Sequence, residues 1–458
     1  MRFAELEHSN VAIWGYGREG RSVLAALRRR FPDKPLTLYC KPDEADVARR
    51  RNDGHLRVVD SSPDVNALSG HDVVIKSPGI SAYKPEILAA RELGTCFASG
   101  TSLWFAENAA GEGGDARIVA VTGTKGKSTT TALIAHCARA VGVRTALAGN
   151  IGLPLLELDG QQADLWAIEL SSFQTGDAGP VDLGVIVSLG EEHLDWHGTR
   201  ERYVSDKLKL ADVSRTLLVD AESPLLMQRT APHVQRRTFD DVHGWHVAGG
   251  FIRDGDDKVL ALRELPLHGA HNARNACAAL AAIELLGLDA RAAARSVPTF
   301  KPLPHRLTSV GMRDGIEWID DSISTTPDAA LAALESLRGR AVTLILGGHD
   351  RGLDWTGFAQ TLRVRPCHAV IVQGAAGPRI AATLRGAGIP GTIEQTGDLA
   401  AAVAHAKVST QTGGVVLLSP GAPSFDQFRD YVERGRVFAR LAGFDDNAIG
   451  EITGLGIA

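Results

Sequence analysis

Short apolar runs rich in β-branched residues alternate with segments of helical periodicity along most of the chain. This alternation predicts α/β units built on mainly parallel sheets. The predicted strands fall into three groups, namely 11–14, 36–39 and 72–75, then 118–121, 165–168 and 184–187, then 342–346, 369–373 and 415–419. After the second group, the turn-rich stretch 238–265 predicts an antiparallel meander, and 275–286 predicts a helix.

Two breaks in this pattern predict three domains. The first group fades near Trp104, and the Gly-rich acidic stretch 110–115 that follows is typical of a linker or surface loop. The segment Pro302-Leu303-Pro304 opens the third group. We therefore expect domains at 1–105, 106–301 and 302–458.

The composition is that of an ordinary globular protein. The 458 residues are 44% hydrophobic and 22% charged, which excludes wholesale disorder. The net charge of −5 disfavours nucleic acid as a partner. The chain shows neither a secretory signal nor an apolar run near the roughly eighteen residues of a membrane span. Five cysteines without CxxC spacing indicate reduced thiols, so we expect a soluble cytoplasmic enzyme with no membrane partner.

The strongest chemical signal is the sequence Gly-Thr-Lys-Gly-Lys-Ser-Thr-Thr at 123–130, which follows a predicted strand and precedes a helical run. Glycines let backbone N–H groups approach phosphate oxygens, a lysine neutralises the β/γ charge, and a serine hydroxyl can bind Mg²⁺. The loop departs from a strict P-loop because Val121 stands where the first glycine would be. The predicted ATP-binding residues here are Gly123, Thr124, Lys125, Gly126, Lys127, Ser128 and Thr129.

Two acidic segments follow the next predicted strands. Glu169 ends the apolar strand 165–168, and the segment 191–197 with His193 follows the strand 184–187. Because ligands collect at the carboxyl ends of parallel strands, both are candidate Mg²⁺ ligands. Taken alone, His193 is more typical of a packed or capping histidine than of a metal ligand.

Two helical segments carry polar residues whose roles the pattern leaves open. Lys207, within Tyr203–Lys209, would ordinarily be a solvated helix lysine. Asn272 and Asn275 lie three residues apart and share a helix face that could hold an adenine ring. The alternative is that Asn272 simply caps its helix.

A GxGxxG motif, Gly15 to Gly20, follows the first predicted strand. An NAD-binding unit needs an acidic residue after the second strand, but Tyr39 is followed by Cys40 and Lys41. Lys41 suits a phosphate better than a ribose diol. The motif therefore indicates a nucleotide site and disfavours a dinucleotide.

Taken together, these motifs resemble the Mur ligases, and more closely their glutamate-adding branch. The resemblance runs collinearly from Gly15 to about Ala442 and rests on the phosphate loop and on the motifs at 149–152, 169–174, 271–275, 303–306 and 418–420. It implies a Rossmann-like UDP-binding domain, a central P-loop ATPase domain and a C-terminal Rossmann-like α/β domain. The implied substrates are ATP, UDP-N-acetylmuramoyl-L-alanine and glutamate, and the amide between the last two would form through an acyl phosphate. We also expect the enzyme to be a monomer.

The resemblance also implies residue roles. The catalytic residues would be Lys127, Glu169, His193 and Lys207. Mg²⁺ would be bound by Ser128, Glu169, His193 and Lys207, the last as N-carboxylysine. Outside the phosphate loop, ATP would contact Asn272, Asn275, Arg306 and Asp321. The UDP substrate would contact Gly15, Tyr16, Gly17, Arg18, Lys41, Ser77, Pro78, Gly79, Asn150 and Ser171. Glutamate would contact Thr325, Arg351, Ser424 and Tyr431.

Three positions depart from the family pattern. Lys125 replaces an Asn in the phosphate loop, and Pro302 replaces a Gly before Leu303. Ile323 stands where the family has a lysine of the glutamate pocket. Without that cation the α-carboxylate of D-glutamate loses a partner, so Ile323 favours L-glutamate as the acceptor.

Three other functions compete with this hypothesis. A folylpolyglutamate synthase belongs to the same superfamily but lacks an N-terminal UDP domain, so the GxGxxG block argues against it. An NAD-dependent oxidoreductase lacks support because the acid after the second strand is missing. A non-catalytic nucleotide-binding protein would have no use for Lys207, Glu169 and His193 together.

Overall fold

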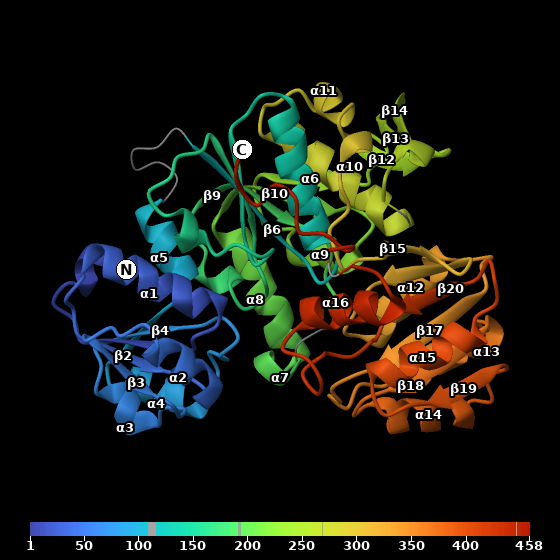
Figure 1. Cartoon of the computed structure of the whole chain (residues 1–458). Helices are drawn as coiled ribbons and strands as arrows, with labels where there is room; N and C mark the ends of the chain where they lie inside the picture. Colours follow the sequence, from blue (N-terminus) through green and yellow to red (C-terminus); the bar gives the residue numbers. More distant parts are fainter. Residues whose placement is uncertain (109–115, 191–193, 268, 446) are drawn as a thin grey trace. The chain divides into compact units, whose positions relative to one another are not determined.

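The computed structural model describes residues 1–108, 116–190, 194–267, 269–445 and 447–458. The chain divides into two compact units, one of Met1–Phe300 with Gly454–Ala458 and one of Lys301–Thr453 (Figure 1). Within the described residues the strands form four sheets, and the three larger sheets are mainly parallel. The predicted α/β class is confirmed. The predicted linker at 110–115 lies outside the described residues.

The first unit begins with a five-stranded parallel sheet of order β3-β2-β1-β4-β5. Its strands are β1 (Val11–Trp14), β2 (Leu36–Tyr39), β3 (Leu56–Val59), β4 (Val73–Lys76) and β5 (Cys96–Ala98). Its helices are α1 (Arg18–Arg30), α2 (Pro42–Arg49), α3 (Val65–Ser69), α4 (Pro85–Glu92) and α5 (Gly100–Glu107). The strand order reverses between β1 and β4, the place where ligands bind in such sheets.

The same unit holds a seven-stranded sheet of order β11-β10-β9-β6-β8-β7-β21. Its strands are β6 (Arg117–Thr122), β7 (Thr145–Gly149), β8 (Leu165–Glu169), β9 (Val181–Ile186), β10 (Ser214–Asp220), β11 (Arg236–Phe239) and β21 (Gly456–Ile457). Its helices are α6 (Lys127–Ala140), α7 (Leu194–His197), α8 (Arg200–Asp212), α9 (Pro224–Arg229), α10 (Ala270–Leu285) and α11 (Ala290–Ala294). The predicted meander is confirmed as β12 (Trp245–Ala248), β13 (Phe251–Asp254) and β14 (Asp257–Ala261).

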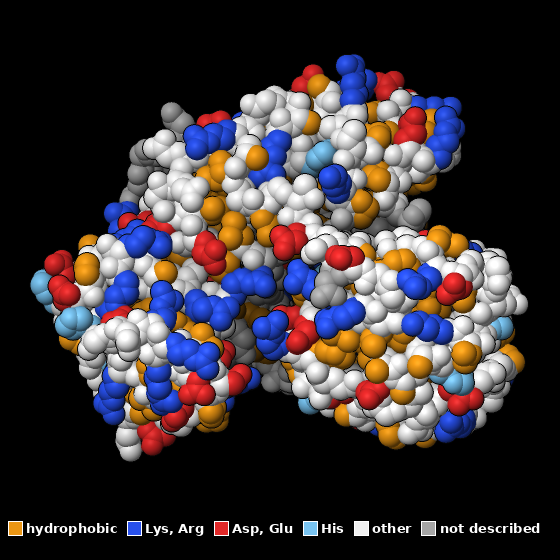
Figure 2. All heavy atoms as spheres, viewed as in Figure 1, with side chains coloured by type: hydrophobic (Ala, Val, Ile, Leu, Met, Phe, Trp, Pro, Cys, Tyr) orange, Lys and Arg blue, Asp and Glu red, His pale blue; other side chains and the backbone are white. Residues whose placement is uncertain are grey.

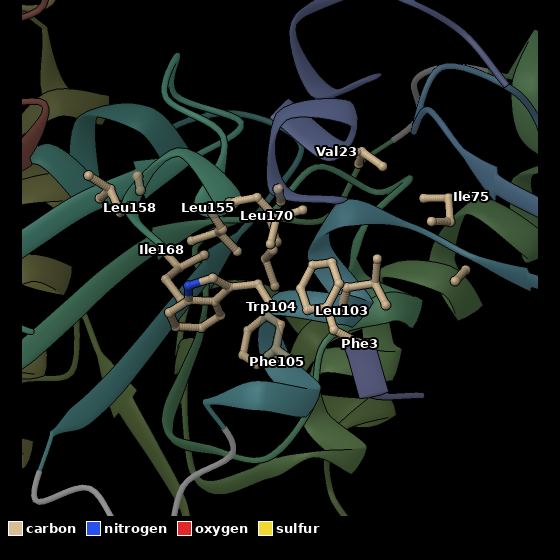
Figure 3. Close-up of a cluster of buried hydrophobic side chains, with 14 of the residues drawn as sticks. Phe3, Val23, Ile75, Leu103, Trp104, Phe105, Leu155, Leu158, Ile168 and Leu170 are labelled. Carbon is tan, nitrogen blue, oxygen red and sulfur yellow. The ribbon is translucent and has the colours of Figure 1, made fainter. Parts of the chain in front are cut away.

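One continuous hydrophobic core joins the two sheets of the first unit. Trp104 and Phe105 of α5 lie among side chains of the central sheet region, including Leu155 and Ile168 (Figure 3). The ring centroids of Trp104 and Trp166 are 4.7 Å apart. Burial of aromatic side chains of this size contributes strongly to stability, so this contact stabilises the core that the two sheets share.

The second unit is a six-stranded sheet of order β15-β16-β20-β17-β18-β19 in which only the β15–β16 pair is antiparallel among the described strands. Its strands are β15 (Thr308–Arg313), β16 (Ile316–Asp320), β17 (Val342–Gly347), β18 (Ala369–Gln373), β19 (Thr392–Gln395) and β20 (Val415–Leu418). Its helices are α12 (Pro327–Ser336), α13 (Thr356–Val364), α14 (Gly377–Gly386), α15 (Leu399–Ser409) and α16 (Tyr431–Ala442). In the described part of the chain, no helix has the length and apolarity needed to cross a membrane.

Strand β21 returns to the first unit and covers the edge of β7 in antiparallel register. Arg139 fastens it, because Nη1 donates to Gly454 O at 2.8 Å and Nη2 donates to Gly456 O at 2.9 Å. Nη2 also donates to Thr145 O of β7 at 2.7 Å. One side chain therefore bonds both strands of the pair.

We expect Arg139→Ala to lower the free energy of unfolding by about 2 kcal/mol, because charge-assisted hydrogen bonds to part-buried carbonyls are lost. Urea denaturation of the full chain measures this. Arg144→Ala, at an exposed arginine just before β7, serves as the matched control and should change little. Equal losses in the two variants would contradict the assigned role of Arg139.

Candidate active site

The phosphate loop connects β6 to α6, as the sequence predicts. Gly126 has φ +83° and is the N-cap of α6. A Cβ on Gly126 would collide with Asn275 Oδ1, so this position requires glycine for both its backbone angle and its neighbour. The backbone N–H of Lys125 donates to Ser188 Oγ at 2.8 Å, and Thr124 Oγ1 hydrogen-bonds with Tyr203 OH at 2.8 Å. These hydrogen bonds hold the loop at the N-terminus of α6, a helix of 14 residues. The N-terminus of a helix favours the binding of an anion.

Side chains of the predicted phosphate site differ in exposure. Ser128 and Thr129 are buried in the first turn of α6, and Lys127 is partly buried as its first residue. Lys125 is exposed. Lys127 is therefore better placed than Lys125 to act in a partly dehydrated site.

Glu169 is fully buried at the end of β8. Its Oε1 accepts a hydrogen bond from Asn150 Nδ2 at 2.8 Å, whereas its Oε2 is buried and has no hydrogen-bond partner. A buried carboxylate oxygen without a donor is costly, and a cation would relieve that cost. Glu169 thus fits a metal ligand.

The other predicted metal ligands are only partly described. His193 lies outside the described residues. Across those that are described, no group of three or more His, Cys, Asp or Glu side chains is arranged to hold a metal ion. Ser128, Glu169 and Lys207 are the predicted metal ligands that the structure describes.

Lys207 is buried in α8, so the interpretation of a solvated helix lysine is wrong. Its Nζ donates to Gly123 O at 2.8 Å and lies 3.5 Å from Thr122 Oγ1. The helix packs so that this side chain reaches the phosphate loop, a contact that spacing along α8 alone does not reveal.

Asn272 and Asn275 do face one way on α10, where Asn275 Nδ2 donates to Asn272 Oδ1 at 3.1 Å. The N-cap of this helix is Gly269, so the alternative that Asn272 caps it is wrong. Arg274 between them donates to both carboxylate oxygens of Asp220 at 2.8 Å. This ion pair, which sequence analysis missed, fixes the start of α10 beside the phosphate loop.

The GxGxxG segment forms a tight turn after β1. A Cβ on Gly20 would overlap the carbonyl oxygen of Gly15, and one on Gly15 would press on Ser77. Ser77 Oγ is buried without a hydrogen-bond partner, next to Pro78 and Gly79 of the predicted loop. Basic side chains are frequent on the visible face of this part of the chain (Figure 2).

The remaining predicted UDP contacts differ in their burial and in their hydrogen-bond partners. The Tyr16 side chain is buried and its hydroxyl accepts a hydrogen bond from Arg51. Arg18 Nη1 donates to Gly152 O at 2.8 Å. Lys41 is exposed at the start of α2. Ser171 Oγ donates to Gln174 Oε1 at 2.8 Å, close after Glu169.

In the second unit, Asp321 is buried after β16. Burial raises the pKa of Asp321 to about 6, although hydrogen bonds from Ser324 and Ser419 act in the opposite direction. Arg306, its neighbour in the predicted ATP contacts, is partly exposed.

The four predicted glutamate contacts lie on segments that hydrogen bonds tie together. Arg434, fully buried, donates to Ser322 O at 2.7 Å and to Ala422 O at 2.9 Å, which joins the segments of Thr325 and Ser424. His349 N donates to Pro423 O at 2.8 Å and so attaches the segment that carries Arg351. Tyr431 begins α16, the helix of Arg434.

Sequence analysis missed both arginines that support these segments. Burial lowers the pKa of Arg434 to about 10, and its Nε has no hydrogen-bond partner. Arg379 donates from Nε to Asp350 at 2.9 Å, and this pairing lowers the pKa of Asp350 to about 2. No local motif marks either residue, because each acts across the fold.

Two family descriptions match this chain. Residues 121–283 match the Mur ligase middle domain, and residues 305–421 match the Mur ligase, glutamate ligase domain. A protein of Xanthomonas euvesicatoria pv. vesicatoria (strain 85-10) named UDP-N-acetylmuramoyl-L-alanine--L-glutamate ligase is 49% identical over 468 residues that cover all of both chains. This chain belongs to the Mur ligase family. A relative of the same name from Salinispora tropica is 38% identical over 96% of this chain and 98% of its own length.

Solved Mur ligases share the fold at low identity. UDP-N-acetylmuramate-alanine ligase MurC from Thermotoga maritima has a TM-score of 0.61 at 20% identity, over 94% of this chain and 99% of that one. MurF ligase from Thermotoga maritima, in complex with ADP, has a TM-score of 0.59 at 16% identity, over 98% and 96%. The chain is thus an ATP-dependent Mur ligase, that is, an acid–amino-acid ligase of peptidoglycan synthesis.

Proposed function

We propose that this Mur ligase adds L-glutamate to UDP-N-acetylmuramoyl-L-alanine in the cytoplasm, with ATP as the energy source. One observation carries the proposal. Buried Lys207 contacts the phosphate loop at Gly123, and Glu169, at the end of a strand that pairs with β6, has a buried carboxylate oxygen without a donor. An oxidoreductase or a passive nucleotide-binding protein has no use for these features. We infer the substrates from the names of the relatives, which are UDP-N-acetylmuramoyl-L-alanine--L-glutamate ligases.

The proposed reaction has two displacements. The alanyl carboxylate attacks the γ-phosphorus of ATP and ADP leaves, and the glutamate amine then attacks the acyl phosphate and inorganic phosphate leaves. Lys127 and the N–H groups of the phosphate loop neutralise charge on the phosphates, the main requirement of phosphoryl transfer. Asn272, Asn275, Arg306 and Asp321 are proposed to hold the rest of ATP.

Mg²⁺ is proposed to bind Ser128, Glu169, His193 and an N-carboxylated Lys207. It would supply charge neutralisation at the phosphates. The Oε2 atom of Glu169 supports the assignment, since it is a buried acceptor without a donor. Carboxylation replaces the cation of Lys207 with an anionic oxygen ligand, which suits a hard metal.

The three predicted domains carry the proposed substrates. The domain 1–105 is proposed to be Rossmann-like and to bind UDP, 106–301 to be the P-loop ATPase domain, and 302–458 to be a second Rossmann-like domain for glutamate. The strand order β3-β2-β1-β4-β5 supports the first, because Gly15 and Ser77 follow β1 and β4 at the reversal point. We further propose that the enzyme is a monomer.

The direct test is phosphate release from ATP by the purified chain. Release should require both UDP-N-acetylmuramoyl-L-alanine and glutamate, and the product should contain both. Release that continues without glutamate, or without the UDP substrate, would contradict the proposal. Activity with a folate and glutamate would instead assign the chain to the folylpolyglutamate synthases.

We expect kcat/KM for L-glutamate to exceed that for D-glutamate by at least about tenfold, the effect of one missing charged partner. Ile323 is partly buried between two buried residues, Ser322 and Ser324, and offers no donor to a second carboxylate. Ile323→Lys should raise kcat/KM for D-glutamate, whereas Ile323→Leu, the matched control, should not. A parent enzyme that prefers D-glutamate would overturn the assignment.

A further inference from the structure

A network of buried hydrogen bonds connects Ser172, His197 and Asp206 in the first unit. His197 Nδ1 lies 2.7 Å from Asp206 Oδ2, and His197 Nε2 lies 3.0 Å from Ser172 Oγ. The exposed fractions of Ser172, His197 and Asp206 are 4%, 0% and 4%. This order of groups is that of a hydrolase triad, but a hydroxyl buried to this degree cannot meet a substrate. We therefore expect this hydrogen-bond network to position other residues of the protein and not to attack a substrate.

Asp206 collects bonds from three directions. Tyr83 OH donates to both of its carboxylate oxygens, at 2.8 and 2.9 Å. Lys209 Nζ donates to Oδ1 at 2.6 Å, and the backbone carbonyl of Asp206 accepts from Thr175 Oγ1 at 2.7 Å. A carboxylate with this many donors has a fixed orientation.

The two end residues of this network, Asp206 and Ser172, each adjoin a residue of the proposed site. Asp206 directly precedes Lys207 on α8, and Lys207 Nζ contacts Gly123 O of the phosphate loop. Ser172 directly follows Ser171, a proposed substrate contact, in the segment that leaves β8 at Glu169. A shift of His197 or Asp206 would therefore move these two segments relative to each other.

Tyr83 brings in the segment 77–84 that follows β4. In that segment Ser81 Oγ donates to Trp196 O at 2.6 Å, and Pro78 O accepts from Trp196 Nε1 at 3.0 Å. The Trp196 ring stacks on Phe173 at 4.7 Å. The proposed UDP loop thus packs on the residues next to His197 and next to Ser172.

We propose that Asp206 and His197 are positioning residues. They hold Lys207 and the Ser171–Ser172 segment in a fixed position relative to each other, and Tyr83 connects them to the segment 77–84. The inference rests on the proposed function. Groups that orient the residues in direct contact with substrate or metal typically change activity by about 10- to 100-fold when they are removed. Their loss should lower kcat and leave KM for ATP nearly unchanged, since the ground-state contacts to ATP remain.

The decisive variant is Tyr83→Phe, which keeps the aromatic ring beside Trp196 and removes only the hydroxyl. We expect kcat to fall about tenfold, with KM for ATP and the thermal midpoint close to those of the parent. Tyr39→Phe is the matched control, because it removes a hydroxyl that bonds His71 Nε2 at 3.1 Å instead of Asp206. The control should retain parent kcat.

A double variant tests whether Tyr83 acts through Asp206. Asp206→Asn should lower kcat by about 100-fold, and Tyr83→Phe combined with it should be no slower than Asp206→Asn alone. If Asp206→Asn fails to fold, the Tyr83→Phe comparison decides alone. A Tyr83→Phe enzyme with parent kcat, or one whose loss matches that of Tyr39→Phe, would overturn the positioning role while the proposed function stands. A parent enzyme without glutamate-dependent phosphate release would overturn both.

Discussion

Lys127→Ala is expected to lower kcat for glutamate-dependent phosphate release by about 10²–10³-fold, the usual loss for one preorganised charge at a developing anion. Lys127 is the first residue of α6 and stands directly after Gly126, whose conformation and packing against Asn275 fix the loop. Its side chain is not part of a hydrophobic core cluster, so the variant should fold normally.

The measurement is steady-state phosphate release with all three substrates, alongside a thermal melt. Lys125→Ala is the comparison within the same loop: Lys125 is exposed, so its removal should cost only a few-fold. A Lys127→Ala enzyme within a factor of two of parent turnover would mean that the phosphate loop has been assigned wrongly.

Lys207→Ala is expected to be nearly inactive, with kcat reduced by at least about 10²-fold. The substitution removes a buried side chain that contacts Gly123 O. It also removes the proposed metal ligand, which is the carboxylated form of the same side chain. Lys207→Arg separates the two roles, because arginine keeps a cation but cannot be carboxylated. It should be as inactive as Lys207→Ala if the anionic form is the working one.

A readout independent of activity is the carbon signal of a carbamate in the parent enzyme after equilibration with [¹³C]bicarbonate. The signal should be absent from Lys207→Arg, and acetate should partly restore turnover to Lys207→Ala by supplying the missing oxygen ligand. An active Lys207→Arg enzyme together with a parent that shows no carbamate signal would contradict the proposal.

Local sequence determined those features whose physics is local. The alternation of apolar runs with helical periodicity predicted the α/β class, because strand and helix periodicities are properties of short segments. The phosphate loop was predictable because glycine, lysine and serine must follow a strand and begin a helix to cradle phosphate. Glu169 was predictable as a polar group that ends an apolar strand.

Tertiary structure alone decided which distant groups meet. Lys207 has the local pattern of a solvated helix lysine, and only the packing of α8 against the phosphate loop buries it. Asn275 reaches Gly126, and Arg434 joins Ser322 to Ala422, through pairings of segments far apart along the chain. Such contacts depend on strand order and helix packing, which no short segment specifies. The motifs therefore fixed which groups are available for chemistry, and long-range packing set their burial, their partners and the pKa values that follow.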